Sequence, residues 1–258
     1  MDGFADDVRL SFVVMHNELL KHVRGRRILV LSALIGLILA AITAAMVFLG
    51  DGLGDDPVGL SSLYCMVISL MIIISVTLFG ATTIVSEYEE RTALILFTRP
   101  IRKWSIFTGK FMAAFAITTA FVIVYYLVVA VLCLIGPGKI DGTLWVSLGY
   151  AVCYCFATTG VAVLISCFMK KASTSSILTF FTLALFLDIV VAVVILAAGL
   201  DDPWYMINSA GNAITSVFGN DLLGPGDPVD GPRTVMVLLL WGFVPAILGY
   251  LGFSRRDF

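Results

Sequence analysis

Six long apolar runs constrain this chain more than any other feature of its sequence. They lie near residues 28–49, 60–85, 105–135, 144–169, 175–200 and 234–252. Each run is close to the roughly 20 residues that an α-helix needs to cross the hydrocarbon core of a membrane. Hydrophobic residues make up 60% of the chain and charged residues only 13%, a balance that a water-soluble domain does not tolerate. We therefore expect an all-α, polytopic membrane protein, a single domain over residues 1–258 with six transmembrane helices within 28–252.

The residues before the first run have a different pattern. Apolar side chains recur there at spacings of four and three residues: Val8, Phe12, Met15, Leu19 and Val23. Charged side chains occupy the rest of the helical wheel, which is typical of an amphipathic helix lying in a membrane interface. We expect residues 1–27 to form such a helix on the cytoplasmic side. The alternative is an ordinary first helix that packs on protein.

Lysine and arginine are distributed unevenly between the two sides of the expected bundle. One side carries most of them: Arg9, Lys21, Arg24, Arg26, Arg27, Arg91, Arg99, Arg102, Lys103, Lys110, Lys170, Lys171, Arg255 and Arg256. The other side carries only Lys139 and Arg233. The positive-inside rule then places both termini and the loop after the second run in the cytoplasm. The expected location is the plasma membrane, with residues 201–233 as the largest external loop.

The longest polar passage of the basic side begins at Ser86. Ser86 and Glu89 have the spacing of a capping box, and acidic residues there suit the first turn of a helix. Leu94 and Phe97 give that helix an apolar side, and Pro100 disfavours helical geometry in the residue before it. We expect a charged helical loop over residues 86–104, between the second and third spans.

This passage resembles the permease subunits of type 2 ABC exporters. The resemblance lies in a glutamate at the end of a span, a Thr-x-x-x-Leu helix, an Arg-Pro-Ile turn, and Gly-Lys-Phe opening the next span. The matching positions are Glu87, Thr92, Leu96, Arg99, Pro100, Ile101, Arg102, Gly109, Lys110 and Phe111. The plan of spans extends the resemblance to nearly the whole chain. One departure is Arg91, which stands where the family commonly has glycine.

The resemblance implies the membrane-spanning permease subunit of an ATP-driven transporter, an exporter by family. Its expected partners are a separate ABC ATPase subunit that binds ATP and magnesium, a second permease copy in a homodimer or heterodimer, and membrane lipid, without nucleic acid. The loop would contain a coupling helix that docks on the ATPase. The residues expected to couple to that partner are Glu87, Glu90, Arg91, Leu94, Phe97, Arg99, Pro100 and Arg102. The simpler alternative is a solvated loop whose charges only set topology.

The sequence offers no catalytic machinery. Gly109-Lys110 lacks the upstream glycine of a phosphate-binding loop, so we expect that the chain itself is not an ATPase. It has no paired histidines in a span, no His-Glu-x-x-His and no Gly-x-Ser-x-Gly, so we expect no other enzyme and no cofactor of its own. The five cysteines lie in apolar runs, where cysteine usually packs as a small hydrophobe. Acidic residues on the external side are interpreted as solvating an exposed face, without a metal site.

Asp188 is the ionisable residue that stands out, because it falls near the middle of the fifth run. A carboxylate there faces a partner or a wet cavity. It is a candidate for the translocation path, or else it pins its helix to hydroxyls such as those of Tyr125, Tyr126, Thr158 or Thr159. Two further functions stay open: an ion-coupled secondary transporter that uses Asp188, and a permease dedicated to copper-enzyme maturation.

Overall fold

The computed structural model describes residues 4–49, 52–89, 102–198, 204–219 and 230–255, and these residues form helices and turns without a strand. The helices are α1 (Phe4–Arg24), α2 (Arg26–Leu49), α3 (Pro57–Cys65), α4 (Ile68–Phe79), α5 (Val85–Glu89), α7 (Lys103–Ile135), α8 (Thr143–Phe168), α9 (Ala172–Phe181), the π-helical turn η1 (Thr182–Phe186), α10 (Leu187–Ala198), α11 (Ile207–Gly211), α12 (Ala213–Ser216) and α13 (Gly231–Arg255). The expected all-α fold is confirmed.

Six helical segments are long and apolar enough to cross a membrane. They are Arg26–Phe48, Pro57–Phe79, Lys103–Ile135, Thr143–Phe168, Ala172–Ala197 and Gly231–Arg255. Each coincides with one of the six apolar runs. The second ends at Phe79, earlier than the run suggests, because residues 81–84 form turns before α5. The expected number and order of spans are confirmed.

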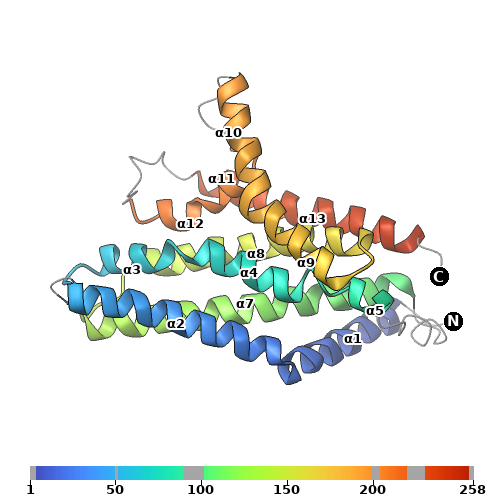
Figure 1. Ribbon diagram of the computed structural model, residues 1–258, viewed down its shortest axis with the longest axis horizontal. Helices are drawn as coiled ribbons and strands as arrows, with labels where there is room; N and C mark the ends of the chain where they lie inside the picture. Colours follow the sequence, from blue (N-terminus) through green and yellow to red (C-terminus); the bar gives the residue numbers. More distant parts are fainter. Residues whose placement is uncertain (1–3, 50–51, 90–101, 199–203, 220–229, 256–258) are drawn as a thin grey trace.

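The spans form an elongated bundle with both ends of the chain at the same end (Figure 1). α8 lies at the centre, packed on α4, α7 and α13, and α2 lies beside α4. α1 bends away from α2 and packs along α7 (Figure 1). α10 rises steeply out of the bundle, so the fifth span departs from the common direction.

Glycine allows a close contact between α8 and α13. A methyl group added at Gly160 would overlap the backbone of Gly242, and one added at Gly242 would overlap the ring of Phe156. Small residues permit this approach in membrane helices, where packing rather than the hydrophobic effect drives association. The last span is thereby held against the centre of the bundle.

Several polar side chains in the core form hydrogen bonds between helices. The Tyr125 hydroxyl donates to the Tyr64 carbonyl oxygen at 2.7 Å. The Tyr126 hydroxyl lies 2.8 Å from the Ser147 hydroxyl, which donates to the carbonyl oxygen of Ile214 at 2.6 Å. Because unpaired polar groups are costly in an apolar interior, these bonds join α3, α7, α8 and α12 in one arrangement.

Two residues of the acidic loops begin helices. Both Asp56 oxygens accept backbone N–H groups, from Val58 and Gly59 at 3.0 Å, and so cap α3. Asp141 accepts the N–H and the hydroxyl of Thr143 at the start of α8, which lowers the pKa of that carboxyl. Asp56 and Asp141 therefore stabilise helix starts, a role that the interpretation of the acidic loops as solvated surface did not predict.

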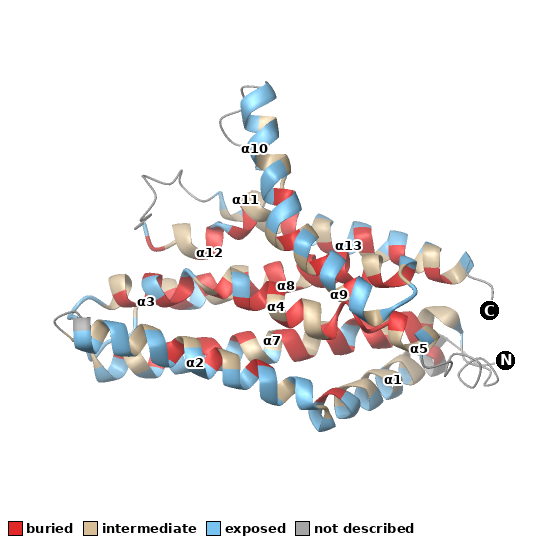
Figure 2. Ribbon diagram, in the orientation of Figure 1, coloured by how far each residue is buried: buried red, intermediate tan, exposed pale blue. Residues whose placement is uncertain are grey.

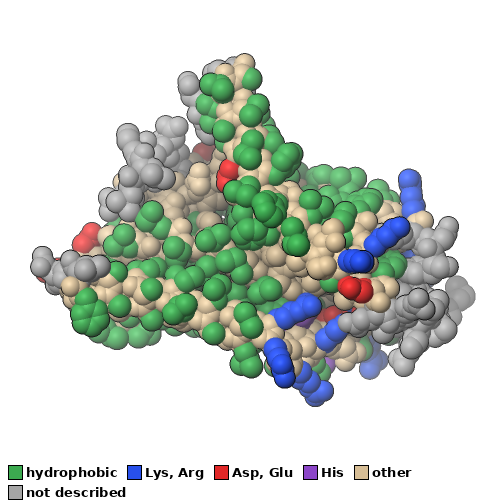
Figure 3. Space-filling view, viewed as in Figure 1, with side chains coloured by type: hydrophobic (Ala, Val, Ile, Leu, Met, Phe, Trp, Pro, Cys, Tyr) green, Lys and Arg blue, Asp and Glu red, His purple; other side chains and the backbone are tan. Residues whose placement is uncertain are grey.

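The outer surface of the spans is apolar. In the apolar stretch of the fifth span 11% of the residues are buried within the chain, against 67% in that of the fourth, so the fifth span faces mostly outward. Figure 2 shows the same contrast between the exposed α10 and the buried centre of the bundle. Lys and Arg gather over the end that carries the termini (Figure 3), as the uneven charge distribution predicted. We call this the basic end.

Candidate functional site at the basic end of the bundle

Lys110 is the centre of a buried charge cluster at the basic end. Its side chain is 2% exposed and its Nζ lies 2.6 Å from Glu18 Oε1 and 2.9 Å from Glu87 Oε1. The Thr83 carbonyl oxygen is a third acceptor, at 3.4 Å. A buried ammonium group is stable only when it is paired and hydrogen-bonded. The cluster therefore ties together α1, α7, and α5 with the turn before it.

The start of α7 is shaped to receive α1. A Cβ added at Gly109 would lie 2.6 Å from the Ser11 carbonyl oxygen and 2.8 Å from Val14 Cβ, so glycine is needed for this approach. Beside it, the Ser11 and Thr108 hydroxyls are 3.2 Å apart. Its packing on α7, together with the Glu18–Lys110 pair, makes α1 part of the bundle. Its placement in a membrane interface stays a prediction.

The two flanks of residues 90–101 are attached to different helices. On one flank, the Glu89 carboxylate accepts the backbone N–H of Ala172, the first residue of α9, at 2.8 Å. On the other, the exposed Arg102 pairs with the buried Asp7 carboxylate of α1 at 3.1 Å. A displacement of the intervening segment would therefore act on α1 and α9 together.

The expected capping box does not form. Ser86 lies inside α5, and its N–H donates to the Thr82 carbonyl oxygen at 3.1 Å, because the chain already turns helically before it. Glu89 is used at the start of α9 instead. The spacing of the two residues was right for the motif, but tertiary contacts determine where the helix begins.

Further hydrogen bonds fasten the turn before α5. The Ser166 hydroxyl accepts the N–H groups of Ile84 and Val85 at 3.2 and 3.1 Å. The Ser175 hydroxyl donates to the Ala81 carbonyl oxygen at 2.6 Å. At the other end of the loop, Lys103 Nζ donates to the Ser254 carbonyl oxygen at 3.0 Å, which links α7 to the end of α13.

His22 lies within the same region and is buried against Phe79, with ring centroids 5.2 Å apart. Burial lowers the pKa of His22 from 6.5 to about 4, against the opposing effect of the Glu18 carboxylate. Three cations also lower it: Arg27, Lys21 and Lys110. The imidazole is therefore neutral at physiological pH, and it adds no charge to the cluster.

Of the residues expected to couple to a partner, the structure describes Glu87 and Arg102. Glu87 faces inward to Lys110, and Arg102 is exposed beside Asp7. The coupling helix and the other expected residues lie outside the described part of the chain: Glu90, Arg91, Leu94, Phe97, Arg99 and Pro100. Sequence reasoning missed the roles of Lys110, Glu18 and Asp7. Lys110 carried a signal, since a lysine within an apolar run requires a partner.

Asp188 lies apart from this cluster, beside a cavity between α4, α8 and α11. Its Oδ1 accepts the side-chain N–H of Asn208. The expected hydroxyl partners do not reach it. Three of them bond elsewhere, Tyr125 to Tyr64, Tyr126 to Ser147, and Thr158 to the Tyr154 carbonyl oxygen, and the Thr159 hydroxyl is buried without a partner among the described residues. Asn208 was not foreseen because it lies on the long loop that returns to the bundle as α11.

Six apolar spans, a basic end and a charged loop held at that end define an α-helical, multi-pass membrane protein. A model of the ABC-2 family transporter proteins matches residues 12–258. The chain therefore belongs to this family, which confirms the resemblance found in the charged loop. No curated protein matches the chain at a significant level. Membership supports an ABC permease over an intramembrane enzyme or an ion-coupled secondary transporter.

Proposed function

We propose that this ABC permease is an exporter powered by a separate cytoplasmic ATPase that docks on residues 86–104. The observation that carries the proposal is the double attachment of this loop, through Glu89 to α9 and through Arg102 to α1. A loop whose charges only set topology has no need of specific attachments to two helices at its base. Its apolar residues Leu94 and Phe97 are the proposed docking surface.

ATP and magnesium belong to the partner in this proposal. Closure of the ATPase would move the loop, and the Glu18–Lys110–Glu87 cluster would pass that movement to α1 and α7. Buried ion pairs are suited to this task, because they resist separation and transmit displacement between rigid helices. The basic end would be cytoplasmic by the positive-inside rule, with both termini there and the spans in the plasma membrane.

A second permease copy, identical or related, would complete the transport path. The fifth span supports this, since most of its apolar surface is exposed in the single chain and its upper part leaves the bundle (Figure 2). Membrane lipid would cover the part of this apolar surface that the second copy leaves exposed. Asp188 stands on this span and is proposed to line the path.

Co-purification from detergent tests the proposal. The tagged chain should retain an ATPase with a phosphate-binding loop, and Leu94→Asp with Phe97→Asp should release it. Ile140→Asp, at the opposite end of the bundle, is the control for an added charge and should retain the ATPase. The proposal fails if a well-folded wild-type chain retains no such ATPase, or if the double variant retains it fully.

A further inference from the structure

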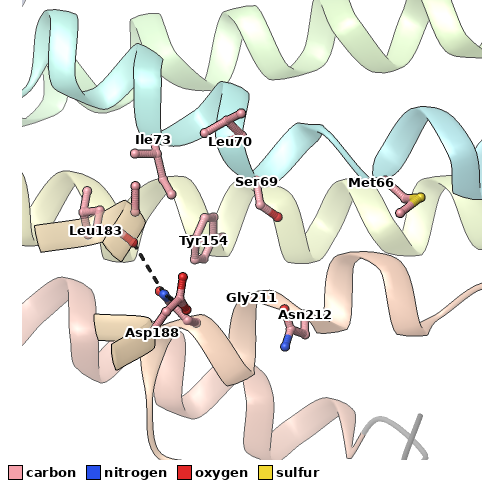
Figure 4. Close-up of a pocket in the computed structure, with 11 residues that line it drawn as sticks. Met66, Ser69, Leu70, Ile73, Tyr154, Leu183, Asp188, Gly211 and Asn212 are labelled. Atoms are coloured by element: carbon pink, nitrogen blue, oxygen red, sulfur yellow. Dashed lines mark hydrogen bonds between the residues drawn. The ribbon is translucent and has the colours of Figure 1, made fainter. Parts of the chain in front are cut away.

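The cavity beside Asp188 combines a carboxylate with apolar side chains and a few polar ones. It has a volume of about 250 Å³ and lies between the α3–α4 connection, α4, α8, η1, α10 and the α11 region. Figure 4 shows Asp188 and Tyr154 pointing toward one another across it. Met66 and Leu70 line one side and are exposed at the surface of the bundle, so the cavity opens beside the apolar exterior.

Two acceptors distinguish this cavity, the Asp188 carboxylate and the side-chain oxygen of Asn208, among a lining that also includes Ser69, Tyr154 and Asn212. Asp188 makes no ion pair with a described lysine, arginine or histidine. Both side-chain N–H contacts of Asn208 go to acceptors of the chain, Asp188 Oδ1 and the Leu183 carbonyl oxygen, while Asn208 Oδ1 is buried without a donor. A buried acceptor without a donor is rare in folded proteins, so the Asn208 oxygen marks a position at which a donor from outside the chain would be satisfied, next to the exposed Asp188 carboxylate.

A π-helical turn lies immediately before Asp188. η1 occupies Thr182–Phe186, and the Leu187 N–H bonds to the Thr182 carbonyl oxygen, five residues back. Such turns are rare and occur often at functional sites. This one supplies Leu183 and Ala184 to the cavity wall directly before Asp188. The irregular stretch of the fifth span thus coincides with its charged residue.

We infer that the cavity binds the ammonium group of a small amphipathic amine. The inference rests on the proposed transport function only for its biological meaning, since binding itself needs neither the ATPase nor transport. An ammonium group offers three N–H donors and a positive charge, which matches the Asp188 carboxylate and the unused oxygen of Asn208. The apolar tail lies along Met66 and Leu70 and reaches the exterior of the bundle.

Size and composition narrow the ligand further. At about 250 Å³ the cavity is below the range of roughly 300–1,000 Å³ that encloses drug-sized ligands, so it accepts a head group rather than a whole amphiphile. A single carboxylate with one amide oxygen is too small a ligand set for a tightly held divalent ion, which takes six or more oxygens. A primary amine with an alkyl chain satisfies both limits, whether it is a free molecule or the head group of a lipid.

The test is binding of octylamine to the purified chain in phosphatidylcholine nanodiscs at neutral pH, with octanol and octanoate as uncharged and anionic probes. Octylamine should bind, and octanol and octanoate at least about tenfold more weakly. Asp188→Asn should weaken octylamine binding by about tenfold or more, as for loss of one charge-assisted hydrogen bond. Asp55→Asn, which removes an exposed carboxylate from a distant loop, should change nothing.

Further arms identify the source of the amine and guard against misfolding. Octylamine binding that weakens when phosphatidylethanolamine is added to the discs assigns the site to a lipid head group, and unchanged binding assigns it to a free amine. If Asp188→Asn does not fold, Ser69→Leu fills the cavity while keeping the carboxylate and should weaken octylamine binding.

Equal binding of the three probes to the wild type, or undiminished octylamine binding to a folded Asp188→Asn or Ser69→Leu variant, overturns the inference. Neither result would affect the co-purification test of the permease function.

Discussion

Lys110 illustrates how a single buried residue can join distant parts of a membrane protein. Its position, a few residues inside an apolar run, could be read from the sequence as a requirement for a partner. Its partners could not, because Glu18 lies 92 positions away in the chain and Glu87 lies 23 positions away. Sequence patterns report local periodicity, and these contacts depend on how α1 folds back along α7.

Substitution of Lys110 by methionine should destabilise the chain by about 3–5 kcal/mol, because two carboxylates would remain buried without their cation. The midpoint of thermal unfolding in detergent measures this. Lys139→Met, at an exposed position of the opposite end, should have no effect. Lys110→Met combined with Glu18→Gln and Glu87→Gln should recover much of the loss. A Lys110→Met variant as stable as the wild type would show that the charge cluster does not stabilise the fold.

His22 predicts how stability depends on pH. Its folded pKa, about 4, lies below the unfolded value of 6.5. Between these values the unfolded chain binds a proton that the folded chain does not, so stability falls as pH drops through this range, by up to about 3 kcal/mol. Unfolding midpoints at pH 7.5 and pH 5 should therefore differ.

His22→Phe keeps a ring against Phe79 and removes the titration, so it should reduce this difference. His16→Gln serves as the control, since His16 is exposed on the same helix. The explanation is wrong if His22→Phe leaves the pH dependence of the wild type unaltered.

The helices themselves were largely predictable, and their ends were less so. The run over residues 60–85 was correctly expected to be a span. Residues 80–84 form turns near its end, however, and the apolar composition of the run does not reveal them. The fifth run was expected as one helix and contains the π-helical turn η1. Hydropathy detects how long a segment stays in lipid, whereas backbone geometry within it is set by neighbouring helices.

Packing of α1 against α7 should depend on Gly109. In Gly109→Val, the added side chain would meet the backbone of α1, and amide hydrogen exchange in α1 should rise while α8 and α13 stay protected. Gly149→Ala is the matched control, since nothing lies within 4 Å of the added atom there. Unchanged exchange in α1 of the valine variant would mean that the helix does not need this close approach.

For the whole molecule, the number of spans, their order and the shared end of both termini followed from apolar length and charge distribution. The arrangement of the spans around α8 and the outward path of α10 did not, because helix contacts in a membrane depend on small residues and polar pairs rather than on amphipathic periodicity. The cavity beside Asp188 could not be predicted from the sequence either. Its carboxylate was foreseen, while Asn208 reaches it from a separate loop.

The central claim is that residues 86–104 dock a separate ATPase and connect it to the bundle. Photocrosslinking in cells tests this most directly, with a benzoyl-phenylalanine placed at Phe97 and, for comparison, at Ile140 of the opposite end. We predict that the Phe97 adduct contains a protein with the Gly-x-x-x-x-Gly-Lys-Ser/Thr phosphate-binding sequence and that the Ile140 adduct does not. Adducts of Phe97 that contain no such ATPase, from cells in which the chain is folded in the membrane, would contradict the account.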